Sequence, residues 1–172
     1  ILGSNLEEIK LFLVSRPYFA PKFADGSFWT NQDYKDFYRA CAHYGSDFWK
    51  IYDVDTNARK FRSAVGQPAV YAYRFDWGSG AEVGPSLSSW YNLVFGACHT
   101  IEIPFFFGNE VGGMAGRVFN EENRPGREVL SRAMMAYVAN FARTGDPNGV
   151  GVPTWSPWSN IAGQSKQIIF DV

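Results

Sequence analysis

The chain has 172 residues, with 16 basic and 17 acidic side chains and a formal net charge of −1. This balance gives no electrostatic reason to expect a nucleic-acid partner or an anionic membrane surface. No apolar run approaches the ~20 residues that span a bilayer, so no membrane span is predicted. Two cysteines are too few for a disulfide framework. Because no Cys, His and Asp residues cluster with ligand spacing, the sequence predicts no metal and no organic cofactor.

The length is sufficient for one domain with a real core, and 17% of the residues are aromatic. The chain begins at Ile1, without Met and without a signal peptide. We interpret it as a piece of a longer protein.

The first half of the chain predicts a strand, two helices and a second strand. "ILGSN" (1–5) resembles a strand end entering a loop, whereas Pro and Gly predict irregular structure over 16–29. Helical spacing predicts a helix from Thr30 or Asn31 that ends at Gly45, and another over 55–65. "AVYAYRFDW" (69–77) is the clearest strand. Its alternate residues are apolar on both faces, which indicates an interior strand covered on both sides.

The second half predicts a connection, a long helix and a closing strand. Residues 78–89 form a flexible connection to a histidine-containing loop. Leu130, Met134, Tyr137 and Phe141 lie along one stripe of a helix that ends at Gly145. "KQIIFDV" (166–172) is a short closing strand. Together these elements predict an α/β protein with a mainly parallel sheet, in which ligands and catalytic groups gather at the carboxyl ends of strands.

His99, one of two histidines in the chain, lies on a small-residue loop after the strand over 69–77. A lone histidine near apolar residues is more often a packed side chain than a catalyst. However, Gly96 and Ala97 leave room for a ligand, and an imidazole can exchange a proton at neutral pH. Such a base needs a carboxylate to fix its tautomer, and Glu7 and Glu8 follow the first strand. A strand-end acid that precedes a strand-end histidine is the order of an α/β-hydrolase triad after its nucleophile.

"GACHTIEIPFFFGN" (96–109) resembles the histidine loop of the type-B carboxylesterases, the family that includes cholinesterases and bile-salt-activated lipase. "LGSNLEEI" (2–9) resembles the Gly-x-Asn-x-Asp-Glu-Gly segment that holds the triad acid of the family. "VYAYRFDW", "NFARTGDPNG" and "PTWSPWS" are similar to further blocks in the same order. The resemblance therefore implies the C-terminal part of an α/β-hydrolase fold, with few strands in a mainly parallel sheet flanked by helices.

Carried over by motif position, the resemblance implies that Glu8 is the triad acid and His99 the general base. Glu102 matches an acidic position near the triad and is expected to support it. Two positions depart from the family pattern: Ile9 stands where Gly usually follows the acid, and Thr100 where Gly usually follows the histidine. The first departure leaves Glu7 as an alternative to Glu8.

No Gly-x-Ser-x-Gly and no His-Gly-Gly-type segment occurs in the chain. Cys98 is a poor substitute nucleophile, because sequence neighbours in an extended loop point in opposite directions. Residues 1–172 are therefore predicted to be the C-terminal segment of a serine carboxylesterase domain, and this piece alone is expected to be inactive. Its predicted partners are a small ester substrate and a missing N-terminal segment of the same protein. A non-catalytic, cholinesterase-like adhesion or binding domain is the alternative.

The aromatic residues near the loop are assigned mainly to packing. Because consecutive residues cannot all face a cleft, we expect Phe105, Phe106 and Phe107 to lie more in the core than in a substrate pocket. Trp155 and Trp158 are expected to pack in surface loops rather than in the site.

Overall fold

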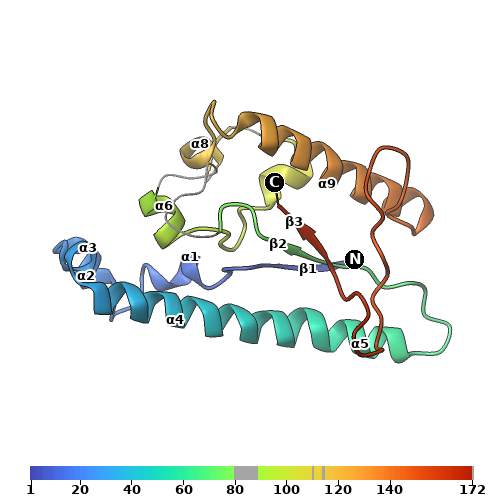
Figure 1. Cartoon of the computed structure of the whole chain (residues 1–172), viewed down its shortest axis with the longest axis horizontal. Helices are drawn as coiled ribbons and strands as arrows, with labels where there is room; N and C mark the ends of the chain where they lie inside the picture. The colour runs from blue at the N-terminus through green and yellow to red at the C-terminus, as the bar shows by residue number, and fades with distance from the viewer. Residues whose placement is uncertain (80–88, 110, 114, 172) are drawn as a thin grey trace.

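The computed structural model describes residues 1–79, 89–109, 111–113 and 115–171. Within them, three parallel strands form one sheet in the order β1 (Leu2–Asn5), β2 (Ala72–Phe75) and β3 (Ile168–Phe170). Leu2 pairs with Ala72 at one end of the β1–β2 ladder, and Phe75 pairs with Phe170 at the end of the β2–β3 ladder. The parallel sheet predicted from the sequence is therefore present, with β2 in its centre (Figure 1).

Helices cover the two faces of this sheet, as Figure 1 shows. A continuous helical run lies along one face and consists of α4 (Gln32–Trp49), the π-helix η1 (Lys50–Asp55) and α5 (Thr56–Ser63). On the other face, α9 (Arg124–Thr144) packs with α7 (Ile103–Phe107). The remaining helices are short: α1 (Lys10–Leu13), α2 (Ala20–Ala24), α3 (Ser27–Thr30), α6 (Ser89–Val94) and α8 (Ala115–Val118). No helix of the described residues is long and apolar enough to cross a membrane.

The central strand β2 faces two separate apolar clusters, as the alternation of its sequence predicts. Tyr71, Phe75 and Trp77 are buried in the cluster beneath α9, which also contains Met134 and Tyr137. Val70 and Ala72 point the other way, into a cluster with Val54, Ala58 and Trp158. A strand that is covered on both sides can be apolar at every position, because neither face meets water.

The predicted long helix is α9, and its stripe of Leu130, Met134, Tyr137 and Phe141 packs on the sheet. Gly145 ends it in the left-handed conformation, with φ of 77° and its N–H bound to the carbonyl of Phe141. The predicted helix over 55–65 is α5, and the closing strand is β3. The connection predicted over 78–89 lies almost entirely outside the described residues.

Two expectations about local structure are wrong, and a third is right only in part. The helix does not end at Gly45, which is part of α4; a Cβ there would lie 2.9 Å from Ile9, so this glycine allows a close approach. The region over 16–29 contains α2 and most of α3, which Pro21 and the left-handed Gly26 help to begin. Trp155 and Trp158 pack from an irregular segment and not in the site, as expected, but they are buried rather than superficial. The Trp155 indole N–H donates to the carbonyl of Ala72, 3.0 Å away, which draws its loop onto the sheet.

Candidate active site

The acid loop, residues Asn5 to Ile9, turns sharply as β1 ends. The backbone N–H of Asn5 donates to Glu8 Oε1 at 2.7 Å, so the Glu8 side chain folds back over the strand end. Ile9 keeps a right-handed helical conformation with φ of −70°, and its N–H donates to Ser46 Oγ on α4. An isoleucine is therefore compatible with the position after the acid, where the family usually has glycine.

The histidine loop, residues Gly96 to Glu102, follows α6 and lies against the acid loop. Glu7 N–H donates to the carbonyl of Ala97 at 3.1 Å, and His99 N–H donates to the carbonyl of Glu8 at 3.3 Å. Glycine is needed at Gly96 because its φ is +49°. Thr100 also has a positive φ, 76°, a conformation that β-branched residues rarely adopt. This strain explains why the family usually has glycine after the histidine.

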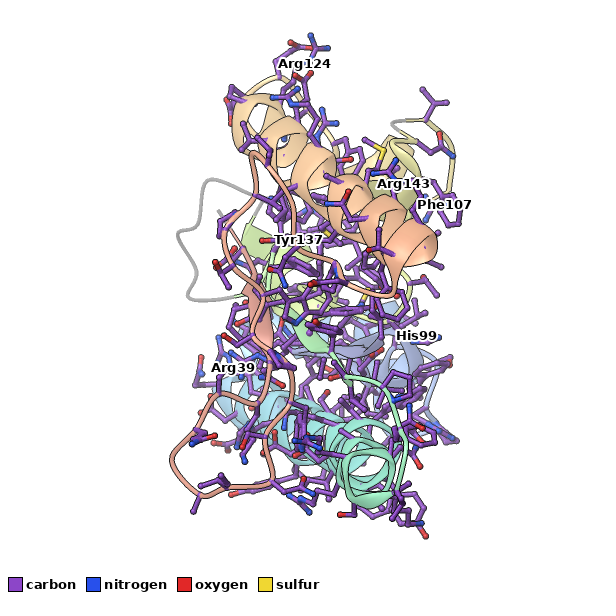
Figure 2. The ribbon with its side chains drawn as sticks, turned by 90° about the vertical axis from the view of Figure 1, so that its right-hand side faces the viewer. Arg39, His99, Phe107, Arg124, Tyr137 and Arg143 are labelled. Atoms are coloured by element: carbon purple, nitrogen blue, oxygen red, sulfur yellow. The ribbon has the colours of Figure 1, made fainter. Side chains whose placement is uncertain are left out.

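The two loops bring the imidazole of His99 and the carboxylate of Glu8 together. Nδ1 of His99 lies 2.8 Å from Oε2 of Glu8. The Glu8 side chain is only 6% exposed and that of His99 is 36% exposed, so the pair has a buried end and an open end. A carboxylate at Nδ1 favours the tautomer that carries its proton there, which leaves Nε2 as the proton acceptor. Figure 2 shows His99 at one side of the molecule.

Glu7, the alternative acid, binds other groups. Its Oε1 lies 2.8 Å from Nζ of Lys10, and its Oε2 accepts the N–H of Ala97 at 3.1 Å. The structure therefore brings Glu8, and not Glu7, into contact with His99.

Burial raises the pKa of the Glu8 carboxyl, and the nearby charge of Glu102 acts in the same direction. The N–H of Asn5 and the imidazole of His99 oppose this shift, because both stabilise the ionised form. The hydrogen bond from the Asn5 N–H and then the contact with His99 are therefore what compensate a carboxylate that water scarcely reaches.

Asn5 supports the site in a way that the sequence analysis missed. Its side-chain Nδ2 donates to the carbonyl of Cys98 at 2.7 Å and also to Oε2 of Glu102. The same residue thus binds the Glu8 carboxylate through its backbone and the histidine loop through its amide. Glu102 lies next to the site, as the resemblance implies, and reaches it through Asn5. The position of an Asn at a strand end was the only available signal.

Two aromatic rings flank the imidazole. The His99 ring centroid lies 5.5 Å from that of Phe12 and 5.1 Å from that of Trp49, at the end of α4. Phe12 and Trp49 also stack on each other, 5.9 Å apart. No sequence pattern connects these two positions, because α4 was expected to end at Gly45.

The other residues considered from the sequence contribute differently. Cys98 is fully buried, and burial raises the pKa of its thiol to about 12, so it would be a very weak nucleophile. Phe105 is buried in the core as expected, whereas Phe107 is 78% exposed. His43 also approaches a carboxylate, Asp47 at 3.6 Å, but both side chains lie exposed on α4.

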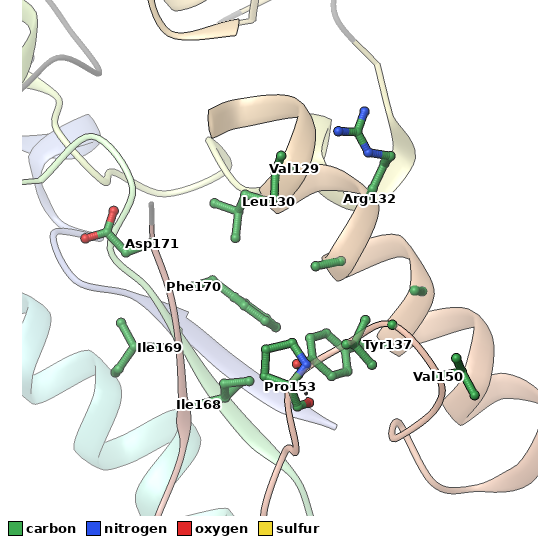
Figure 3. Close-up of a pocket in the computed structure, with 14 residues that line it drawn as sticks. Val129, Leu130, Arg132, Tyr137, Val150, Pro153, Ile168, Ile169, Phe170 and Asp171 are labelled. Carbon is green, nitrogen blue, oxygen red and sulfur yellow. Dashed lines mark hydrogen bonds between the residues drawn. The ribbon is translucent and has the colours of Figure 1, made fainter. Parts of the chain in front are cut away.

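A separate cavity of about 520 Å³ lies between α9, the loop over 150–153 and β3. Figure 3 shows Phe170 and Tyr137 against it, with Arg132 and Asp171 among the few polar residues of its lining. It contains no residue of the acid or histidine loops. The described residues also contain no cluster of three or more His, Cys, Asp or Glu side chains that could hold a metal ion.

The sequence model of the carboxylesterase family matches residues 18–170. The chain belongs to this family. The solved structure of the Geobacillus stearothermophilus carboxylesterase superimposes with a TM-score of 0.59 at 25% sequence identity. The matched region covers 98% of this chain and 36% of the Geobacillus chain. The three-stranded sheet and its flanking helices are therefore part of an α/β-hydrolase fold.

Curated relatives match shorter stretches. Carboxylesterase 5A of Canis lupus familiaris is 46% identical over 74 residues, which are 42% of this chain and 12% of the relative. Acetylcholinesterase of Gallus gallus is 44% identical over 92 residues, which are 52% of this chain and 10% of that enzyme. The matched regions thus span about a tenth of the length of these relatives.

Proposed function

We propose that this chain supplies the histidine and the acid of a Ser-His-Glu triad in a longer serine carboxylesterase. The observation that carries the proposal is the 2.8 Å contact between His99 Nδ1 and Glu8 Oε2. It leaves Nε2 to act as the base on the open side of the ring. The family membership supports a carboxylic ester as the substrate, and the nucleophilic serine and the oxyanion hole would come from another segment of the protein.

The reaction would proceed as two acyl transfers. In the first, Nε2 of His99 takes the serine proton as the serine oxygen attacks the ester carbonyl. The imidazolium then returns that proton to the departing alcohol, which leaves an acyl-enzyme. In the second, Nε2 activates a water that releases the acid and restores the serine. Throughout both steps, Glu8 would hold the imidazole and offset its positive charge. This chain alone contains no serine in a nucleophile motif, so it would be inactive by itself.

The proposal is tested in the full-length protein that contains this chain. In a p-nitrophenyl butyrate assay, His99→Ala is expected to lower kcat/KM by about 10³-fold or more, because the general base is lost. A fluorophosphonate probe should label a serine outside this chain in the wild type and label it much more slowly in the variant.

His43→Ala is the matched control, because His43 also pairs with a carboxylate but lies exposed on α4. It should retain wild-type activity and labelling. A wild-type protein that neither hydrolyses esters nor reacts with the probe would instead indicate the non-catalytic binding domain.

A further inference from the structure

The ammonium group of Lys10 is buried between the two loops that form the site. Its Nζ lies 2.8 Å from Oε1 of Glu7 and donates to the carbonyl of Asn92, also at 2.8 Å. Lys10 is the first residue of α1, and Asn92 lies on α6, which leads into the histidine loop. One side chain therefore connects the segment after the triad acid with the segment before the histidine.

Glu7 completes this connection with its second carboxylate oxygen. Oε2 accepts the N–H of Ala97, while the backbone N–H of Glu7 donates to the carbonyl of the same residue. Ala97 is thus bound to Glu7 by two hydrogen bonds, two residues before His99. A Cβ at Gly96 would lie 1.8 Å from Glu7 Oε2, so the carboxylate lies directly against the backbone of the histidine loop.

The backbone on both sides of the pair is braced by α4. The hydroxyl of Tyr38, a fully buried residue, lies 2.8 Å from the carbonyl of Val94 and 3.1 Å from that of Lys10. The ammonium, the carboxylate and the phenol therefore fix the same junction of α1, α4 and α6.

A buried ion pair of this kind adds little net stability, because the desolvation of two charges offsets their attraction. Removing only one of the two charged side chains is costly, because the other charge then remains in the protein without its partner. Burial lowers the pKa of Lys10, whereas the charge of Glu7 and its hydrogen bond oppose that shift. A pair with these properties specifies geometry more than it stabilises the fold.

We propose that Glu7 and Lys10 form a clasp that holds the histidine loop on the acid loop and thereby sets the distance between His99 and Glu8. This proposal rests on the proposed function, because a triad requires the His99 Nδ1 to Glu8 Oε2 distance that the clasp sets. Both are positioning residues, since their side chains bind the loops rather than the imidazole. The adjacent acids then have separate tasks, with Glu8 binding the base and Glu7 binding the chain that carries it.

A double-mutant cycle in the full-length protein tests the clasp. Glu7→Gln leaves the ammonium unpaired, Lys10→Met leaves the carboxylate unpaired, and the double variant removes both charges. Each single variant is expected to lower kcat by about 10- to 100-fold with KM within about twofold, because a small misplacement of a catalytic group is costly. The double variant should lose no more than the worse single variant, since the two residues act as one unit.

The proton on Nδ1 of His99 provides a readout that does not depend on turnover. Its downfield proton NMR resonance should be sharp in the wild type and broadened or lost in both single variants, because the bond to Glu8 is no longer held. Lys50→Met is the control: its ammonium pairs with Asp55 at 2.8 Å and is also partly buried, so it should leave kcat and the resonance unchanged.

Losses in kcat that multiply in the double variant, or a resonance unchanged in both single variants, would overturn the clasp. If Lys10→Met does not fold, Glu7→Gln alone decides through the resonance. If the wild type hydrolyses no ester, the proposed function fails, and the resonance still decides whether the clasp holds the histidine.

Discussion

At the scale of single residues, position on the backbone decides which of two identical functional groups meets the imidazole. Glu7 and Glu8 are neighbours, yet Glu8 binds His99 and Glu7 binds Lys10 and Ala97. The turn that begins at Asn5 directs the two carboxylates to different partners, because the N–H of Asn5 donates a hydrogen bond to Glu8 Oε1. The order of residues brought both acids to the strand end, but only the fold of the loop assigns them different partners.

Thr100 shows the cost of a side chain where the backbone favours glycine. Its φ of 76° places a β-branched residue in the left-handed region, which costs an L-residue about 1–2 kcal/mol. Replacing Thr100 by glycine removes this strain, but glycine loses more backbone entropy on folding, which offsets part of the gain in stability. Thr100→Gly is therefore expected to raise the free energy of unfolding by about 0.5–1 kcal/mol in a urea titration.

The matched control is Thr154→Gly. Thr154 is also a threonine but does not have a positive φ, since Thr100 is the only non-glycine residue of the described chain that does. The exposed Thr154 should lose about 0.4–1 kcal/mol on the same change, because glycine only adds freedom to the unfolded chain there. Equal effects of the same sign at both positions would show that the backbone of Thr100 is not strained.

At the scale of elements, the buried hydroxyl of Tyr38 is one of the contacts that tie α4 to the site. The Tyr38 hydroxyl has one proton to donate and lies nearest the carbonyl of Val94, with that of Lys10 also in reach, so Tyr38→Phe removes a buried hydrogen bond. We expect a loss of about 1–3 kcal/mol in the free energy of unfolding. Thermal or urea unfolding, monitored by circular dichroism, measures it.

Tyr44→Phe on the same helix removes an equivalent hydroxyl from a side chain that is 71% exposed. Its stability should stay within about 0.5 kcal/mol of the wild type, as is usual for surface substitutions. A Tyr38→Phe variant as stable as Tyr44→Phe would mean that the Tyr38 hydroxyl does not help to hold α4 on the site.

At the scale of the whole molecule, the elements with a local signal were predicted correctly. The two faces of β2 and the stripe of α9 are encoded by alternation and helical spacing, which need no knowledge of distant residues. Gly45 was misread because its role depends on Ile9, which is remote in sequence but close in space. The burial of Trp155 has no signal in the sequence, because its loop has no period and its indole binds the distant carbonyl of Ala72.

The candidate site was predictable to the same extent. His99 and Glu8 lie in recognisable loops, so the resemblance could place them. Phe12, Trp49 and Lys10 could not be placed, because their contacts join segments that no periodicity relates. Such contacts depend on how α1, α4 and α6 meet, which is a property of the assembled fold.

Phe170 joins distant parts of the chain into one core. On β3 it packs against the rings of Tyr73, Phe106, Tyr137 and Trp155, with centroids 5.4, 6.3, 5.8 and 5.5 Å away. These contacts link β2, α7, α9 and the loop before β3. Phe170→Ala is expected to lower the free energy of unfolding by about 3–5 kcal/mol, because the lost ring leaves a cavity where these elements meet.

The adjacent Ile169 provides the control, because it lies on the opposite face of the same strand and is 43% exposed. Ile169→Ala removes a side chain without opening the shared core, so its cost should be at most half that of Phe170→Ala in the same urea titration. If the two variants lost the same free energy of unfolding, the ring contacts of Phe170 would contribute no more than an exposed side chain of the same strand. β3 would then be held mainly by its backbone hydrogen bonds to β2, and not by the aromatic cluster that joins it to α7 and α9.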